Sequence, residues 1–206
     1  MPPIPELEAI RKAQILEAGL KTLTQKGSAN VTMDDVCKAA GLSKGGLVHY
    51  YKTKRMLFDA VFEEFFKRIF QKSRDTMARH EHPMDKLLSF EWLYDDQDPD
   101  AMVGYPILLD CMALAVHDEA YRALIQVWIT HWIELLSLAL EQGIAEGVFS
   151  PMDVTAVAQS ISAVYQGVAT RWFLARETHS TPWAVDSFQK GIQGILRPHM
   201  KQDYPS

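Results

Sequence analysis

Residues 43–54 hold the side chains that are best suited to binding a polyanion. Lys44 can donate to a phosphate or to a guanine edge, and the two glycines after it let the backbone approach a partner closely. His49 and Tyr50 supply hydrogen bonds and stacking surfaces. Lys54 stands at the start of a long predicted helix, where its charge joins the helix N-terminus against a phosphate. The pattern predicts contacts with DNA.

Two short predicted helices position these residues. Thr32 and Asp35 form a capping box, which predicts a helix from residue 33, and Gly41 ends that helix as a left-handed residue. Ser43 is a second N-cap and opens a helix to about residue 50. This is the spacing of a helix-turn-helix, whose first helix crosses the DNA backbone while the second lies in the major groove. A pair of packed helices that binds no DNA has the same spacing.

The charge of the chain is distributed unevenly. The formal net charge is −5, which argues against a general nucleic-acid coat. Residues 1–55 carry nine Lys or Arg and five Asp or Glu, so this segment has a net charge of +4. Residues 56–206 carry 12 basic and 21 acidic residues, a net charge of −9. The asymmetry predicts that only the N-terminal segment meets a polyanion.

The length of 206 residues fits one domain, or a small domain joined to a larger one. Apolar residues recur at helical spacing, and the alternation typical of strands is nearly absent. The sequence therefore predicts an all-α fold of about nine helices, with a basic head over residues 1–54 and a larger bundle over residues 55–206. A phenylalanine-rich helix from about residue 53 to 79 is expected to join the two.

Cysteine usage and the absence of a targeting signal predict a cytoplasmic protein without a membrane partner. Cys37 and Cys111 exclude a disulfide scaffold and a four-cysteine zinc site, and they fit a reducing compartment. The N-terminus does not read as a signal peptide, and no stretch approaches 18 uncharged apolar residues. His80 and His82 lack a third ligand nearby, so no metal and no cofactor is predicted.

Aromatic residues of the predicted bundle could surround a small molecule. All five tryptophans lie beyond residue 90. Such stripes are usual in helical cores, and they also suit an apolar cavity between long helices. With a carboxylate nearby, at Asp110 or Glu134, aromatic walls would suit a quaternary ammonium cation, whereas a flat aromatic molecule or an acyl chain would fit equally. The candidate ligand-binding residues are Phe62, Trp92, Asp110, Trp128, Trp132, Tyr165 and Trp172.

The residue order across the two short helices is similar to a known signature. It reads Thr32-x3-Val36-x2-Ala39-Ala40-Gly41-Leu42-Ser43-x-Gly45-x-Leu47-x2-Tyr50-Tyr51-x2-Lys54-x2-Leu57. This pattern resembles the TetR/AcrR family of bacterial repressors over about residues 10–60. Residues 115–118 and 167–172 also resemble the branch that contains choline-responsive regulators of the betaine pathway.

The resemblance implies an all-α homodimer. Its N-terminal three-helix domain, residues 1–54, would bind a palindromic operator, and residues 55–206 would bind a small molecule that releases the DNA and would form the dimer. Val48 stands where many members have a tyrosine that touches phosphate, so Tyr50 or His49 would take that contact. The candidate DNA-binding residues are Thr32, Lys44, Gly45, Gly46, His49, Tyr50 and Lys54.

The last two predicted helices, about residues 152–176 and 183–196, are expected to pair with their copies in a four-helix interface. The residues predicted to be buried there are Val157, Ile161, Phe188 and Ile192, or their neighbours. The predicted function is a repressor that a small apolar, aromatic or cationic ligand releases from DNA. A DNA-binding activator without an effector is one alternative. An enzyme on a helical bundle is another, but the chain lacks a glycine-rich phosphate loop, paired Glu-x-x-His motifs and a nucleophile elbow.

Overall fold

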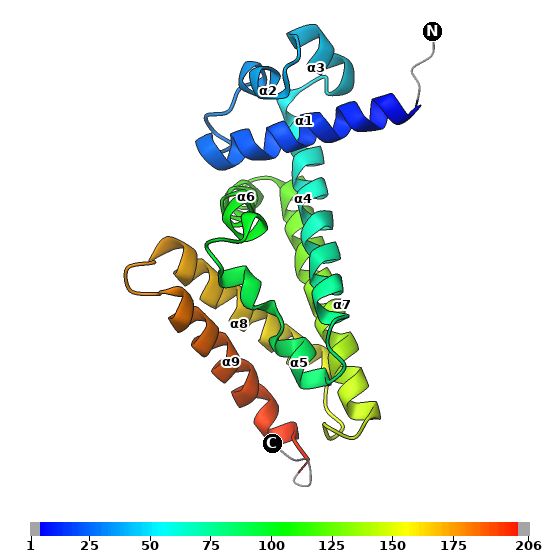
Figure 1. The fold of residues 1–206 in the computed structure, drawn as a ribbon, viewed down its shortest axis with the longest axis vertical. Coiled ribbons are helices and arrows are strands. Elements are labelled where there is room, and N and C mark those ends of the chain that lie inside the picture. The colour runs from blue at the N-terminus through cyan, green and yellow to red at the C-terminus, as the bar shows by residue number, and fades with distance from the viewer. Residues whose placement is uncertain (1–4, 202–206) are drawn as a thin grey trace. The chain divides into compact units, whose positions relative to one another are not determined.

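The computed structural model describes residues 5–201, and over this range the chain is built from helices, with one isolated β-bridge (Figure 1). This confirms the predicted all-α fold of about nine helices. The α-helices of the described range are α1 (Pro5–Lys26), α2 (Met33–Ala40), α3 (Lys44–Tyr50), α4 (Lys54–Met77), α5 (Pro83–Leu88), α6 (Pro99–Ala115), α7 (Glu119–Ala145), α8 (Val154–Leu174) and α9 (Thr181–Leu196). Two short 3-10 helices, η1 (Phe90–Tyr94) and η2 (Arg197–His199), complete it.

Two helix boundaries differ from the sequence-based expectation. The spacing predicts one helix over residues 84–93, but α5 ends at Leu88 because the Ser89 amide and hydroxyl both donate to the Lys86 carbonyl. The sequence Ser-Pro-Met-Asp at residues 150–153 predicts a helix that begins after Ser150. In the structure Ser150 instead donates to the His199 carbonyl, and Asp153 caps α8 by accepting from the Ala156 amide at 3.0 Å.

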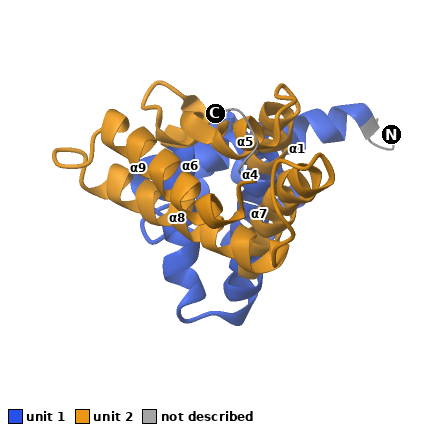
Figure 2. Cartoon of the chain, turned by 90° about the horizontal axis from the view of Figure 1, so that it is seen from below, with its two compact units in different colours: residues 1–68, 103–125 blue, residues 69–102, 126–206 orange. Residues whose placement is uncertain are grey.

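The described chain forms two compact units, coloured separately in Figure 2. Unit 1 contains residues 1–68 and 103–125, and unit 2 contains residues 69–102 and 126–206. The sequence-based boundary at residue 54 therefore lies inside unit 1. The reason is that α4 continues unbroken past Lys54 and that most of α6 packs with the N-terminal helices. A Cβ added at Gly104 of α6, for example, would lie 2.6 Å from the Phe65 ring of α4.

The core of unit 1 fixes the N-terminal helices against the first half of α4. Ile15, Leu20 and Leu23 of α1 are buried, whereas Ile10 is 55% exposed. A Cβ added at Gly19 would lie 2.7 Å from a methyl group of Val61, so α1 crosses α4 closely at this glycine. Because this crossing has no room for a larger residue, it fixes where α1 lies along α4.

The core of unit 2 is a continuous aromatic cluster. The Trp132 ring lies 5.3 Å from the Phe90 ring and 6.2 Å from the Tyr165 ring, and Tyr165 stacks on Phe188 at 5.3 Å. Helices α8 and α9 pack closely, since a Cβ at Gly191 would lie 2.9 Å from the Val164 side chain. Edge and offset contacts of this kind stabilise a core beyond the area that they bury.

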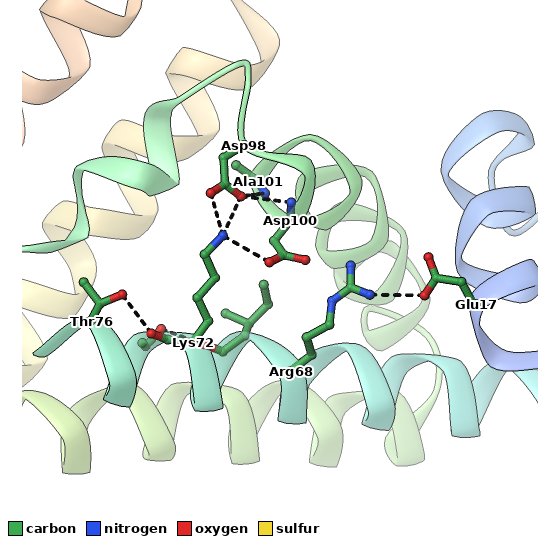
Figure 3. Close-up of polar contacts among 9 residues, drawn as sticks. Glu17, Arg68, Lys72, Thr76, Asp98, Asp100 and Ala101 are labelled. Atoms are coloured by element: carbon green, nitrogen blue, oxygen red, sulfur yellow. Dashed lines mark hydrogen bonds and ion pairs between the residues drawn. The ribbon is translucent and has the colours of Figure 1, made fainter. Parts of the chain in front are cut away.

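A lysine secures the start of α6 within unit 2. Lys72 Nζ contacts Asp98 Oδ2 at 2.5 Å and Asp100 Oδ2 at 3.0 Å (Figure 3). It also lies 4.2 Å from the centre of the Trp92 ring. Asp98 also accepts the amides of Asp100 and Ala101, and so it caps the helix. Because the lysine and both carboxylates are mostly shielded from water, this cluster holds the loop before α6 in one geometry.

Helix α7 is the one helix of the described range that is long and apolar enough to cross a membrane by length and composition. That is weak evidence, because the core helices of soluble proteins meet the same criteria. One face of α7 carries Trp128, Trp132, Leu136 and Leu140, which are buried. Core packing therefore accounts for only part of the apolar character of the helix, because Val127, Ile129 and Leu138 are exposed.

Candidate nucleic-acid interface

Helix α2 begins and ends as its sequence predicts. The Asp35 amide donates to Thr32 Oγ1 at 3.2 Å, and Asp35 Oδ2 accepts the Thr32 amide at 2.9 Å, which completes the capping box. Gly41 follows the helix with φ 64° and ψ 36°, a left-handed conformation that favours glycine. Lys26 and Thr32 both donate to the Asp35 carboxylate and hold its pKa below the ordinary value. The geometry fixes the turn that leads to α3.

Helix α3 presents most of its surface to solvent. Ser43 accepts the Gly46 amide at 3.1 Å and caps the helix, and Leu47 is fully buried and anchors it. Lys44 and His49 are exposed, and Val48 is 39% exposed. The side chains that could contact DNA therefore lie on a helix that one buried apolar residue, Leu47, anchors to the subunit.

Gly45 leaves a bare stretch of backbone on the first turn of α3. A Cβ added there would meet no atom within 4 Å, so the subunit itself does not require a glycine at this position. At Gly46 the same addition would lie 3.4 Å from Ser43 Oγ. Packing within the subunit therefore does not explain the glycine at position 45. The lack of a side chain there leaves room for a partner to approach the backbone.

The cationic side chains of this surface already have partners in the subunit. Lys44 Nζ lies 3.3 Å from Asp34 Oδ1, on α2. Lys54 Nζ lies 5.0 Å from the centre of the Phe58 ring. Contacts of this type stabilise a protein little, so neither of them prevents its lysine from contacting DNA.

The start of α4 is fixed from two directions. Thr53 Oγ1 accepts the Met56 amide at 3.1 Å, as its N-cap position predicts. Arg55 makes a two-pronged contact with Asp118, at 2.6 and 3.0 Å, and this hydrogen-bonded partner lowers the pKa of Asp118. Through these contacts Lys54 is held directly after the turn that follows α3.

The seven candidate DNA-binding residues lie within residues 32–54 of unit 1, in and around α2, α3 and the start of α4. Thr32, Lys44, Gly45 and His49 are exposed, whereas Gly46, Tyr50 and Lys54 are half-buried. The His49 and Tyr50 rings meet edge to face at 5.2 Å. The Thr32 hydroxyl is also engaged with Asp35, to which it donates at 2.7 Å.

The structure brings together four of the candidate ligand-binding residues. Trp128, Trp132 and Tyr165 belong to the aromatic cluster of unit 2, and Trp172 lies 6.3 Å from Tyr94 beside it. Their polar atoms are used internally: the Tyr165 hydroxyl donates to the Leu87 carbonyl, and Trp172 Nε1 donates to Thr181 at 3.0 Å. Burial raises the pKa of Tyr165 well above its ordinary value, so this phenol stays neutral.

The other three candidates lie elsewhere. Phe62 and Asp110 belong to unit 1, where Phe62 meets the Tyr121 ring at 5.7 Å. Asp110 accepts the Ser28 amide at 2.6 Å, and so it holds the loop between α1 and α2. Trp92 lies under Lys72 in unit 2. Glu134 is exposed.

The four candidate dimer residues pack inside the subunit. Val157 is 9% exposed, and Ile161, Phe188 and Ile192 are fully buried. A side chain whose surface the subunit already covers has none left for a second copy. The interface would have to use the neighbouring exposed residues of α8 and α9, among them Gln159, Ser160, Ala163, Leu174, Gln193 and Gly194.

The titratable side chains of the described range form no metal site. Within residues 5–201, no three His, Cys, Asp or Glu side chains gather closely enough to hold a metal ion. Cys37 and Cys111 are free and buried, and burial raises the pKa of Cys111 to about 12. That thiol therefore stays protonated near neutral pH.

Sequence reasoning missed the acidic partners of unit 1. Asp34 beside Lys44, Asp118 beside Arg55 and Asp110 beside Ser28 all join residues that are ten or more positions apart. Helix periodicity carries no signal for such pairs. For Asp34 the sequence holds a weak signal, because Asp35 completes the capping box with Thr32 and Asp34 takes no part in it.

A helix-turn-helix with an exposed second helix, joined to a separate helical unit, is typical of a DNA-binding regulator. Two family models match the chain: bacterial regulatory proteins of the tetR family over residues 15–61, and the C-terminal region of BetI-type transcriptional repressors over residues 90–197. The chain belongs to the TetR family of transcriptional regulators, with a C-terminal region of the BetI type. This family consists of regulators rather than enzymes.

Individual relatives agree with this assignment. The chain is 28% identical to the HTH-type transcriptional regulator YfiR of Bacillus subtilis over 147 residues, which cover 69% of each chain. It is 23% identical to the regulator BetI of Brucella anthropi over 87% of this chain and 90% of BetI. The fold matches that of a transcriptional regulator from Saccharomonospora viridis in complex with choline, with a TM-score of 0.79 and 15% identity over 94% of this chain and all of the other.

Proposed function

We propose that this regulator is a repressor that binds an inverted-repeat operator as a dimer and leaves it when a small molecule binds. The observation that carries the DNA-binding part is the exposed, glycine-bearing first turn of α3 next to Lys44. The contacts are assigned to Thr32, Lys44, Gly45, Gly46, His49, Tyr50 and Lys54. The BetI-type C-terminal match supports repression rather than activation.

Two single changes test these contacts. Lys44→Ala removes the first cation of α3, and Tyr50→Phe removes only a hydroxyl from a half-buried ring. Both variants should lose operator affinity at least about tenfold while keeping the wild-type circular dichroism spectrum, since a good base contact contributes ~1–3 kcal/mol. Lys67→Ala, at an exposed lysine further along α4, is the matched control and should bind as the wild type does. Unchanged affinity in both variants would refute the placement of α3 in the groove.

The dimer is assigned to α8 and α9 of two copies. Exposed small and apolar residues support this, notably Ala163, Gly194 and Leu174, which is 65% exposed. Such a dimer would present two copies of α3 about one DNA turn apart, ~34–36 Å. Ala163→Glu would place like charges at the interface and should yield a monomer by light scattering, whereas Glu81→Ala at an exposed loop site should not. A dimeric Ala163→Glu variant would refute this surface.

The effector is assigned to the small apolar, aromatic or cationic class. The aromatic cluster around Trp132 and Tyr165 supports it, as does the choline bound in the structurally similar regulator. Since Asp110 is engaged by Ser28, a cation would be recognised through ring faces rather than through that carboxylate. Titration of choline, an aromatic acid and a fatty acid against tryptophan fluorescence tests this. No response to any of them would favour the alternative of a DNA-binding protein without an effector.

The cytoplasm is the proposed location, because operator DNA and a reducing environment for Cys37 and Cys111 are found there. Fractionation of expressing cells tests it. Recovery with the membrane fraction would contradict the proposal and would give α7 a different role.

A further inference from the structure

Asp34 lies in the first turn of α2, where a carboxylate suits the helix N-terminus, but it takes no part in the capping box. Its carboxylate lies 3.3 Å from Lys44 Nζ, and the side chains of Asp34 and Lys44 are 62% and 71% exposed. The neighbouring Asp35 completes the capping box of α2 and pairs with Lys26 at 2.6 Å. The contact with Lys44 therefore has no capping task, and an exposed pair of this kind adds little to stability.

A carboxylate is an unfavourable neighbour for a DNA phosphate, because like charges repel. A lysine ammonium carries three donors. One of them can stay on Asp34 while the other two reach O6 and N7 of a guanine, which presents no negative charge. If Lys44 turned to a phosphate instead, it would bring that phosphate close to the Asp34 carboxylate.

We propose that Asp34 is a specificity-determining residue, which keeps Lys44 for a guanine edge and disfavours its binding to phosphate. The inference rests on the proposed DNA contact of Lys44. Binding to random DNA depends almost wholly on phosphate contacts, so Asp34 weakens it. Operator binding adds base contacts that Asp34 permits. The ratio of operator affinity to random-DNA affinity is therefore higher with Asp34 than without it.

The substitution Asp34→Asn tests this, since the amide keeps the shape and removes the charge. Affinity would be measured by fluorescence anisotropy for the operator, obtained by selecting bound duplexes from a random pool, and for a scrambled duplex, in a series of salt concentrations. One more effective cation steepens the salt dependence by a slope of about 0.9, which corresponds to about five- to tenfold tighter scrambled-DNA binding near 0.1 M salt. Operator affinity should change less than about twofold, so specificity falls by nearly the same factor.

Two controls isolate the pair. Glu17→Gln removes an exposed carboxylate that pairs with Arg68 at 3.2 Å (Figure 3), and it should change neither affinity. In a Lys44→Ala background, Asp34→Asn should no longer tighten scrambled-DNA binding. The proposal is overturned if Asp34→Asn strengthens operator and scrambled binding equally, or if the gain survives without Lys44. If the selection yields no operator, the proposed function itself is overturned. If an operator is found and the Asp34→Asn variant binds it with unchanged specificity, only this inference is overturned.

Discussion

Substitutions at Gly45 test whether α3 is the helix that reads DNA. A side chain added at this position should stabilise the free protein or fit it without cost, but it should weaken DNA binding. A Cβ at this position meets no atom within 4 Å, and the residue lies outside the left-handed backbone region. An alanine therefore fits the free protein without rearrangement. Alanine favours a helix over glycine by about 0.5–1 kcal/mol, so Gly45→Ala should raise the free energy of unfolding by up to that amount in urea denaturation.

The same position should be intolerant of larger side chains when DNA is bound. If the bare backbone lies against the duplex, Gly45→Leu removes that approach and should weaken operator binding at least about tenfold, or ~1.4 kcal/mol. Anisotropy with a labelled operator measures this. Gly46→Ala is the matched comparison: its Cβ would lie 3.4 Å from Ser43 Oγ, so it should gain less stability than Gly45→Ala.

Two results would refute this reasoning. A loss of stability in Gly45→Ala would mean that the first turn of α3 is packed more tightly than the structure has it. Wild-type operator affinity in Gly45→Leu would mean that DNA does not approach this turn of the helix.

Three further changes probe the framework around the interface. Thr32→Ala removes the hydroxyl that accepts the Asp35 amide and should lower the free energy of unfolding by about 1 kcal/mol in urea; no change would mean that the capping box is dispensable. Arg55 lowers the pKa of Asp118, so their pair stabilises the fold above the ordinary carboxyl pKa of about 3.9, and this contribution is lost as the pH falls through the lowered pKa. Arg55→Met should therefore reduce the melting temperature at pH 7, and its deficit should shrink in acid; a deficit independent of pH would assign the effect to packing. Tyr165→Phe leaves the buried Leu87 carbonyl without its donor and should cost about 1–2 kcal/mol by thermal unfolding, with the circular dichroism spectrum retained.

Local chemistry explains why the helix-turn-helix could be predicted from sequence. The Thr32–Asp35 box, the left-handed Gly41 and the Ser43 cap each act over a few residues, so their spacing defines both helices and the turn between them. The exposed face of α3 follows from the same register, because Leu47 alone must be buried.

Contacts between distant segments could not be predicted in this way. The sequence around Ser150 reads as a helix start, but its amide and hydroxyl donate to the carbonyl of His199, 49 positions further on. Asp110 looked like a counterion for a ligand, yet it binds the Ser28 amide. The apolar stripes of α8 and α9 indicate that these side chains are buried, but they do not show whether the same subunit or a second copy covers them. In the structure Ile161 and Phe188 are covered by their own subunit.

Selection of bound duplexes from a random pool, at about 150 mM salt, tests the central claim most directly. This salt concentration suppresses binding that depends on phosphates alone. Sequence-specific reading by a dimer predicts one enriched inverted repeat, with half-sites about 10–10.5 base pairs apart or a multiple of that, bound on the order of a thousandfold better than bulk DNA. A pool that stays random after repeated rounds, with protein from which bound small molecules have been removed, would contradict the account.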